Sequence, residues 1–141
     1  MKSMLKKILR WLFGDYAAYH VYRNGANLAA PANGFTVRQI DAGDLQRSPD
    51  TDIGEQAFYL GEGAHGFGCF DGDALVGVCF YWHGQRYLKR NFWPLAEREA
   101  KLVQIITLPR MRDRSVAPTL IQESARAMQA LGFTRNYARI W

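Results

Sequence analysis

A short basic segment between an apolar stretch and a long amphipathic stretch carries the residues best suited to bind an anion. The apolar stretch ends in Ile105–Pro109, and Arg110, Arg112 and Arg114 follow it. Short residues at Ser115–Ala117 then open a predicted helix. N–H groups in the first helical turn lack partners within the helix, and the helix dipole favours negative charge there. Guanidinium groups can bind phosphate oxygens bidentately, so this segment predicts a pyrophosphate-binding turn.

The elements on either side position this turn. Lys101–Leu108 is mostly apolar and predicts a strand. Ser115–Leu131 predicts a helix, and Gly132 is a suitable stop because a helix often ends at a left-handed residue. The expected inner face of the helix is Val116, Leu120, Ile121, Ala127, Met128 and Leu131. Since Phe133–Trp141 predicts another strand, the three elements form a β-α-β unit with parallel strands and a right-handed crossover.

Upstream, the pattern predicts further strands and short helices. Phe35–Ile40 alternates apolar and polar residues, as a strand does. Loop and short helix are expected over 41–60, with Asp52 as an N-cap. Asp71-Gly72-Asp73 joins the runs 64–70 and 74–82, which predicts a hairpin. A short strand is expected at Arg86–Leu88 and a loop over 91–97.

Arg112-Asp113-Arg114-Ser115-Val116-Ala117 resembles the acetyl-CoA-binding signature of the GCN5-related N-acetyltransferases, the GNAT superfamily. That signature is Arg or Gln, two residues, Gly, one residue, and Gly or Ala. The resemblance implies an α/β (α+β) fold, a GNAT-like mixed sheet flanked by helices over 35–141. It also implies an acyl-CoA co-substrate, bound where the fourth and fifth strands part. An extra N-terminal helix and missing C-terminal elements would set this chain apart from the usual family core.

The resemblance also assigns binding residues. Backbone N–H groups on the fourth strand hold the acyl carbonyl, and the following turn holds the pyrophosphate. Ser115 stands where the family usually has Gly; its N–H can still donate and its hydroxyl can cap the helix, but its Cβ narrows the space. The implied residues are Ile105, Ile106, Thr107, Arg112, Asp113, Arg114, Ser115, Val116 and Ala117.

The groups that would move protons are harder to find. In many family members a carboxylate on the fourth strand acts as the general base, whereas this strand carries Lys101, Val103 and Gln104. Glu99, just before it, is the candidate base, with an ordinary exposed carboxylate as the alternative. The family's tyrosine acid lies beyond the fifth strand, where this sequence ends, and Tyr137 is expected to be a packing residue. An unpaired fifth-strand edge would favour homodimerisation through it.

The N-terminal residues form a separate predicted unit. Leu5, Ile8, Leu9, Leu12 and Phe13 recur at helical spacing beside several lysines, which predicts a basic amphipathic helix within 1–23, followed by a linker over 24–34. Such a helix can lie on a membrane surface. Packing against this protein or another subunit is the alternative, and the more common one.

Composition limits which other protein classes and kinds of binding site the chain can represent. The chain of 141 residues suits one core, and 48% hydrophobic and 13% aromatic residues indicate a folded protein. Cys69 and Cys79 are expected to be reduced sheet residues of a cytoplasmic protein, peripheral to a membrane if the N-terminal helix binds one. The three widely spaced histidines predict no metal site. A net charge of +5 suits anionic ligands, yet one basic-aromatic run over 86–90 is weak support for nucleic-acid binding.

The sequence therefore predicts a GNAT-type N-acyltransferase, acetyl-CoA-using by default, whose amine acceptor it does not identify. The alternatives are a catalytically inactive remnant that binds acyl-CoA or mediates assembly, and a membrane-surface protein. An aromatic group could line an acceptor pocket, although core packing is its commoner role. Its members are Tyr81, Trp82, Tyr87, Phe92 and Trp93.

Overall fold

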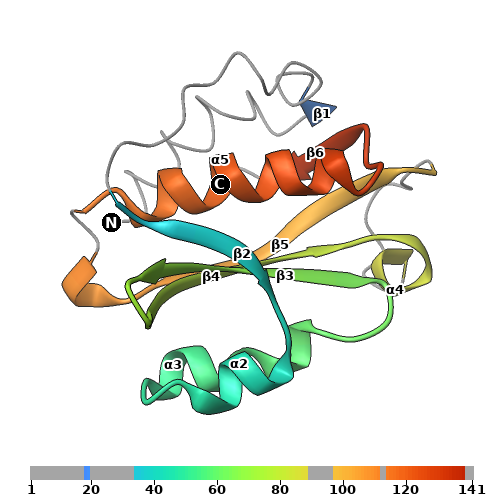
Figure 1. The fold of residues 1–141 in the computed structure, drawn as a ribbon. Helices are drawn as coiled ribbons and strands as arrows, with labels where there is room; N and C mark the ends of the chain where they lie inside the picture. The colour runs from blue at the N-terminus through green and yellow to red at the C-terminus, as the bar shows by residue number, and fades with distance from the viewer. Residues whose placement is uncertain (1–17, 20–33, 89–96, 112–113, 139–141) are drawn as a thin grey trace.

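A six-stranded mixed sheet with helices on both faces forms the fold (Figure 1). The structure is a computed structural model that describes residues 18–19, 34–88, 97–111 and 114–138. The strands are β1 (Ala18–Tyr19), β2 (Thr36–Ile40), β3 (Ala64–Asp71), β4 (Ala74–Trp82), β5 (Glu99–Thr107) and β6 (Arg135–Ala138). The helices are α2 (Ala42–Arg47), α3 (Thr51–Gly54), α4 (Gly84–Leu88) and α5 (Val116–Ala130), with 3-10 turns η2 (Glu55–Tyr59) and η3 (Pro109–Met111).

The strand order is β1-β6-β5-β4-β3-β2, and only the β5–β6 pair is parallel. Helix α5 covers one face of the sheet, and α2, α3 and η2 lie against the other (Figure 1). Side chains from both faces of the sheet join the core, among them the fully buried Phe67 and Phe80, and Leu120 of α5 is also fully buried in it. This mixed sheet flanked by helices confirms the fold class expected from the sequence.

The hairpin and the long helix lie where the sequence predicts them. The β3–β4 pairing closes on Asp71 opposite Ala74, with Gly72 at φ 63° in the turn. At the end of α5, Gly132 has φ 103°, and the N–H of Phe133 donates to the carbonyl of Met128, which completes a Schellman motif. The predicted inner face of α5 is correct except for Leu131, which follows the last turn and is 49% exposed.

The edge of the sheet beside β6 differs from the prediction. Ala18 and Tyr19 of β1 pair antiparallel with Tyr137 and Asn136 of β6. The predicted N-terminal helix is therefore wrong at these two positions, and the rest of residues 1–23 lies outside the described residues. The fifth-strand edge is also not free there, because backbone of the same chain occupies it. Homodimerisation through that edge stays a prediction, but an unpaired edge is no longer a reason for it.

Two further local predictions are wrong. Two helices start in 41–60, at N-caps Asp41 and Asp50. Asp41 forms a capping box, because its side chain accepts from the N–H of Asp44 while Asp44 accepts from the N–H of Asp41. Asp52 instead lies within α3. The predicted strand at 86–88 is helix α4, because Arg86 reaches back to backbone carbonyls of the η2–β3 loop and Tyr87 is fully buried.

Of the described residues, no helix is both long enough and apolar enough to cross a bilayer. The linker predicted over 24–34 lies outside the described residues except for Gly34. Arg112, Asp113, Phe92 and Trp93 also lie outside them. The account of the site below therefore rests on β5, η3, α5 and their neighbours.

Candidate functional site

The N-terminus of α5 begins at a residue in the left-handed backbone region. Ser115 has φ 66° and ψ 25°, and its hydroxyl makes no capping hydrogen bond. The predicted serine cap is therefore wrong, because an N-cap residue normally has extended backbone that aims its side chain at the first turn. A left-handed backbone is the conformation glycine adopts without cost. Ser115 thus keeps the local geometry expected of the family's usual glycine.

The first turn of α5 presents backbone N–H groups to its surroundings. No hydrogen bond between described residues uses the N–H groups of Ser115, Val116 or Ala117. Pro118 has no N–H, and the N–H of Thr119 donates to the carbonyl of Ser115 at 3.2 Å, which is the first bond of the helix. Unpartnered N–H groups at a helix N-terminus attract an anion.

The connection from β5 to α5 is tight and partly basic. The N–H of Met111 donates to the carbonyl of Leu108, and the N–H of Arg114 to that of Met111. Arg114 and Arg110 are exposed, but Arg110 lies 3.6 Å from a carboxylate oxygen of Asp50. Of the described arginines here, Arg114 is thus the one whose side chain has no partner among the carboxylates of the described residues.

Close packing fixes the start of α5 against the sheet. Val116 is fully buried over Gly77 of β4, and a Cβ added to Gly77 would lie 2.7 Å from Cγ1 of Val116. That distance is shorter than any ordinary carbon–carbon contact. Gly77 therefore sets how near the turn lies to β4 and β5.

The residues of β5 that were predicted to bind the acyl carbonyl differ in the direction of their backbone N–H groups. The N–H of Leu108 donates to the carbonyl of Val76, so this group points at β4. Directions alternate along an antiparallel strand. The N–H of Ile106 therefore also points at β4, whereas those of Ile105 and Thr107 point to the opposite side.

That opposite side is where β6 departs. The β5–β6 pairing runs from Glu99 opposite Arg135 to Leu102 opposite Ala138, and no described residue pairs with β5 beyond it on that side. The β4–β5 register also shifts here: Tyr81 pairs with Leu102 and Phe80 with Gln104. Val103 is thus an extra residue, a bulge that bends the strand.

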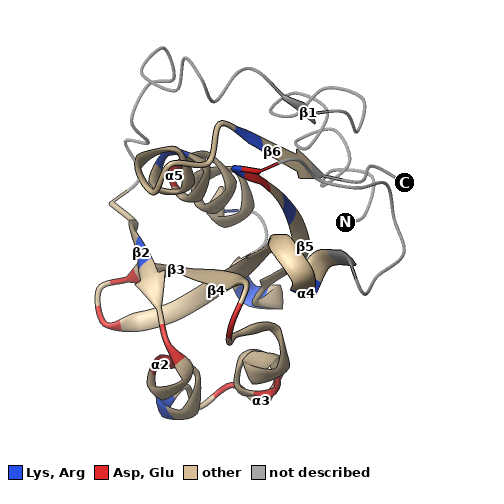
Figure 2. Cartoon of the chain, turned by 90° about the vertical axis from the view of Figure 1, so that its right-hand side faces the viewer, with Lys and Arg blue, Asp and Glu red and all other residues tan. Residues whose placement is uncertain are grey.

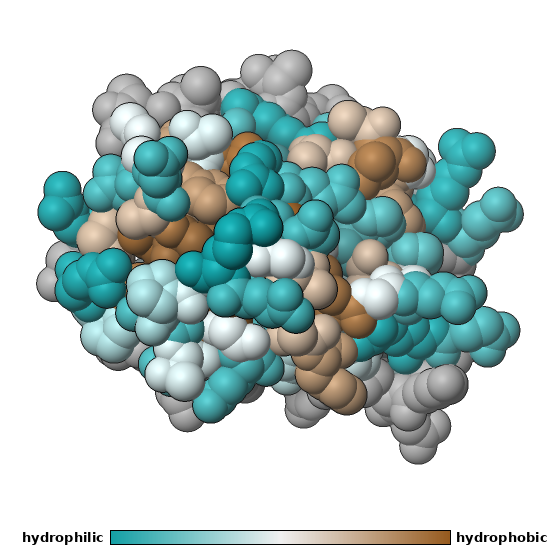
Figure 3. All heavy atoms as spheres, turned by 60° about the horizontal axis from the view of Figure 1, so that its bottom comes forward, coloured by the Kyte–Doolittle hydropathy of each residue, from teal (hydrophilic) through white to brown (hydrophobic). Residues whose placement is uncertain are grey.

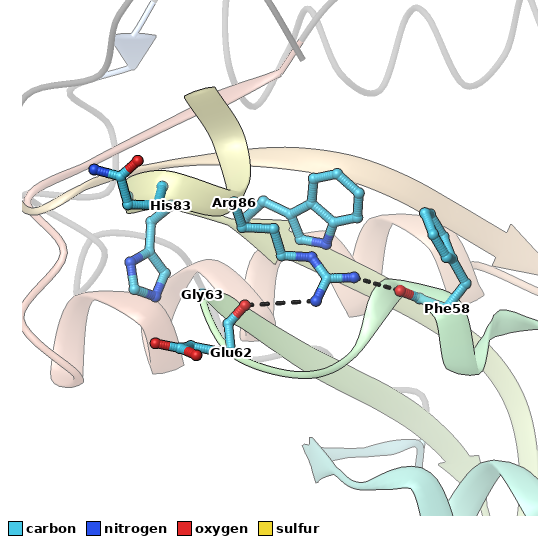
Figure 4. Close-up of a pocket in the computed structure, with 8 residues that line it drawn as sticks. Phe58, Glu62, Gly63, His83 and Arg86 are labelled. Carbon is cyan, nitrogen blue, oxygen red and sulfur yellow. Dashed lines mark hydrogen bonds between the residues drawn. The ribbon is translucent and has the colours of Figure 1, made fainter. Parts of the chain in front are cut away.

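A cavity of about 700 Å³ lies on the side of the sheet where η2 packs. Figure 4 shows Arg86 in its centre, with its guanidinium aimed at the carbonyls of Phe58 and Glu62. The same guanidinium lies 4.4 Å from the ring centre of Trp82 and 5.8 Å from that of Phe58. The lining residues are Phe58, Glu62, Gly63, Trp82, His83, Gly84, Gln85 and Arg86.

Of the aromatic group that the sequence singled out, Trp82 lines this cavity, whereas Tyr81 and Tyr87 are fully buried. Phe58 is 69% exposed at the rim. Neither Phe58 nor Arg86 has a sequence pattern that predicts it as a lining residue, because the loop after η2 brings the two together.

Comparison of folds identifies the architecture. No protein-family model and no curated protein matched this chain. Among solved structures, it is similar to a ribosomal-protein-alanine N-acetyltransferase from Brucella melitensis biovar Abortus 2308, with 14% identity, 74% of this chain and 79% of that chain covered, and a TM-score of 0.53. The chain has the GNAT fold.

Two other solved structures agree with this assignment. An aminoglycoside acetyltransferase from an uncultured soil metagenomic sample, solved with trehalose, has 13% identity over 77% of this chain and 78% of that chain, with a TM-score of 0.53. An aminoglycoside N-acetyltransferase in complex with CoA has 18% identity over 79% and 80%, with a TM-score of 0.51. At these identities the similarity concerns the fold.

Within this GNAT fold, Glu99 lies on β5 rather than in an exposed loop. Its Oε2 accepts from the Tyr137 hydroxyl at 3.2 Å and lies 3.9 Å from Nη1 of Arg135. Burial and the negative charge of Glu99 raise the pKa of Tyr137. Six residues separate Glu99 from Ile105, which is roughly 20 Å along a strand. The structure therefore does not bring the candidate base close to the candidate carbonyl-binding N–H, and Tyr137 is more than a packing residue.

Both cysteines and two of the histidines lie in packed parts of the GNAT-fold domain. Cys69 and Cys79 are free and buried, as predicted, and burial raises the pKa of each thiol to about 12. Two of the histidines that are widely spaced in the sequence lie together in the fold: the rings of His65 and His83 stack at 5.3 Å with Phe133 against them. Burial lowers the pKa of both imidazoles, and the charge of His83 lowers that of His65 further.

Charge is unevenly distributed over the domain. Residues 41–73 hold eight Asp and Glu and one Arg, and two arginines from outside this range, Arg38 and Arg110, pair with Asp44 and Asp50. Figure 2 shows these acidic segments on and around α2 and α3, with basic segments on β5 and β6. The face that carries α2 and α3 is mostly hydrophilic, with hydrophobic groups only in separate patches (Figure 3). An acidic face of this kind attracts cations.

Proposed function

We propose that this protein is an N-acyltransferase that transfers an acyl group, acetyl in the first instance, from acyl-CoA to an amine. The observation that carries the proposal is the turn at Ser115–Ala117, where N–H groups without partners among the described residues follow a left-handed residue. The GNAT fold supports it, and one neighbour of that fold was solved in complex with CoA.

Two sets of backbone N–H groups would bind two different parts of acyl-CoA. N–H groups of Ser115, Val116 and Ala117 would bind the pyrophosphate, with added positive charge from Arg114. N–H groups of Ile105 and Thr107 face the side where β6 departs and would bind the acyl arm and its carbonyl. A hydrogen bond to the carbonyl oxygen stabilises the charge that develops there when an amine attacks.

The acceptor would approach from the face of the sheet that carries α2, α3 and η2, which is opposite the face covered by α5. Amines are cations in water, and the acidic surface around α2 and α3 would raise their local concentration. The 700 Å³ cavity lies on this side, and the rings of Phe58 and Trp82 line it. Because the guanidinium of Arg86 already lies 4.4 Å from the Trp82 ring centre, these rings would take an apolar portion of the acceptor rather than its ammonium group. We therefore propose a cationic amine with an apolar portion as the acceptor class.

Two measurements test the proposal. At about 100 times its dissociation constant, acetyl-CoA would stabilise the protein by about 2.7 kcal/mol, which a thermal melt detects. Ala117→Glu places a carboxylate in the phosphate turn and is expected to weaken CoA binding at least tenfold, a loss of about 1.4 kcal/mol. Ala130→Glu adds the same charge at the exposed far end of α5 and is the control. Equal CoA affinity in both variants would place the site elsewhere.

A non-catalytic acyl-CoA-binding module is the second candidate. It is favoured by the distance between Glu99 and Ile105, because a general base must lie within hydrogen-bond reach of its proton or act through water. Release of CoA thiol with a panel of amines separates the two functions. Acetyl-CoA binding without thiol release from any amine would favour the module.

A further inference from the structure

The N–H of Ile105 is occupied in this structure, and the side chain that occupies it comes from the preceding residue. It donates to Oε1 of Gln104 at 3.1 Å. This bond is unusual for a strand, where a backbone N–H ordinarily donates to the neighbouring strand. The bulge at Val103 and the end of the β6 pairing leave this N–H facing a side without a described strand.

The carboxamide of Gln104 is held in place from the other side. Its Nε2 donates to Oε1 of Gln56 at 3.3 Å, and Nε2 of Gln56 donates to the carbonyl of Asp52 at 2.9 Å. The chain of amides thus runs from α3 through η2 to β5. Both glutamines are half-buried, so their bonds are shielded from water in part.

An amide oxygen and a thioester oxygen are both carbonyl acceptors. The bond to Oε1 of Gln104 shows that the N–H of Ile105 can bind an amide carbonyl oxygen, and in the proposed site an acyl carbonyl would use the same N–H. One N–H cannot donate a good linear bond to both oxygens at once. The two ligands, one internal and one external, must compete.

We propose that Gln104 occupies the acyl carbonyl position in the ligand-free protein and is displaced when acyl-CoA binds. This inference rests on the proposed function. Free CoA has no acyl carbonyl, so it leaves the Gln104–Ile105 bond intact. The bond therefore lowers the affinity for acyl-CoA but not for CoA, and it reforms once the acyl group has been transferred. Gln104 is in this sense a positioning residue that sets the preference between substrate and product.

The displaced carboxamide of Gln104 can stay bonded to Gln56. Gln56 holds its Nε2 on the η2 side, which is the side of the acidic face and the cavity. A rotation about the terminal torsions of Gln104 would release Oε1 while the bond to Gln56 persists. Oε1 would then be an acceptor for the N–H of an approaching amine.

Gln104→Met tests the inference, because it removes the acceptor and keeps a chain of similar length. Calorimetric titration with acetyl-CoA and with CoA is expected to show acetyl-CoA binding about 2- to 10-fold more tightly than in the unaltered protein, or about 0.4–1.4 kcal/mol, with CoA unchanged. Gln56→Met is expected to shift the ratio in the same direction and less. Gln46→Met, at an exposed position on α2, is the control.

Hydrogen exchange of the Ile105 amide provides a second measurement without any ligand. Exchange is expected to accelerate in Gln104→Met and to stay the same in Gln46→Met. CoA binding with an unaltered acetyl-CoA to CoA ratio in Gln104→Met overturns the inference alone. Failure of both ligands to bind the unaltered protein overturns the proposed function and the inference with it, whatever the exchange rate of Ile105.

Discussion

Ser115→Gly is expected to stabilise the protein and to leave the proposed acyl-CoA site intact. The residue has φ 66° and ψ 25°, its side chain is exposed, and its hydroxyl makes no capping bond. Little is therefore lost with the side chain, while the strain of a left-handed residue with a Cβ disappears.

The size of the effect follows from two opposing terms. Left-handed backbone costs a residue with a Cβ about 1–2 kcal/mol relative to glycine. Glycine increases the conformational freedom of the unfolded chain, which costs about 0.4–1 kcal/mol. The expected net gain in the free energy of unfolding is about 0.7 kcal/mol, or roughly 2 °C in melting temperature for a chain of this size.

Chemical denaturation and thermal melts measure this difference, with Ser115→Ala as the matched control. Alanine keeps the Cβ and is expected to leave stability unchanged. If glycine lowers the free energy of unfolding, or if alanine raises it as much as glycine does, the left-handed strain at this turn is not what the backbone angles indicate. CoA titration should find Ser115→Gly binding at least as tightly as the unaltered protein.

Three further predictions concern other parts of the domain. Gly77→Ala should push Val116 outward, cost about 1–3 kcal/mol of stability and weaken CoA binding in titrations; normal CoA affinity would mean that Gly77 does not set the turn. The lowered pKa values of His65 and His83 mean that their neutral forms favour folding, so this stability is complete above about pH 6.5 and is lost as pH falls through the lowered values. Melts of His65→Phe between pH 7.5 and 5 should decline less, and parallel curves would refute this. Phe58→Ala should raise the acceptor KM and leave the acetyl-CoA dissociation constant unchanged, since Phe58 is exposed at the cavity rim; an unchanged KM argues against the cavity as the acceptor site.

Local signals account for the parts of the fold that the sequence predicts correctly. Asp71-Gly72 fixes the β3–β4 hairpin because the left-handed glycine suits its turn. Gly132 ends α5 for a similar local reason. In both cases the structure is decided by neighbours in the chain, and the sequence displays them directly.

Long-range contacts account for the parts that it does not predict. Helix α4 forms where Arg86 binds carbonyls of the η2–β3 loop, more than twenty positions away in the chain. The pairing of Ala18 with Tyr137 spans most of the chain. No periodicity in either segment carries this information, because each contact depends on where a distant element lies.

The candidate site combines the two kinds of information. Residue types alone predict the phosphate-binding turn, and its geometry depends on the φ angle of Ser115 rather than on the predicted cap. Which N–H groups of β5 are available depends on strand alternation and on the bulge at Val103. The bond between Gln104 and Ile105 follows from that bulge and has no signature in the sequence.

A site built from backbone N–H groups, as proposed here, would tolerate wide divergence of sequence within one fold. Pyrophosphate and carbonyl binding at Ser115–Ala117 and Ile105 would require a helix start, a strand direction and a strand without a neighbour, and many side chains satisfy these conditions. A similar fold at 14% identity is therefore expected. Proton transfer has no such freedom, because it needs a titratable side chain within reach of the reacting amine. Since Glu99 lies roughly 20 Å along β5 from Ile105, the proposed acyl transfer would depend on water or on the acceptor amine itself for proton removal, and its rate should follow the fraction of neutral amine as pH rises.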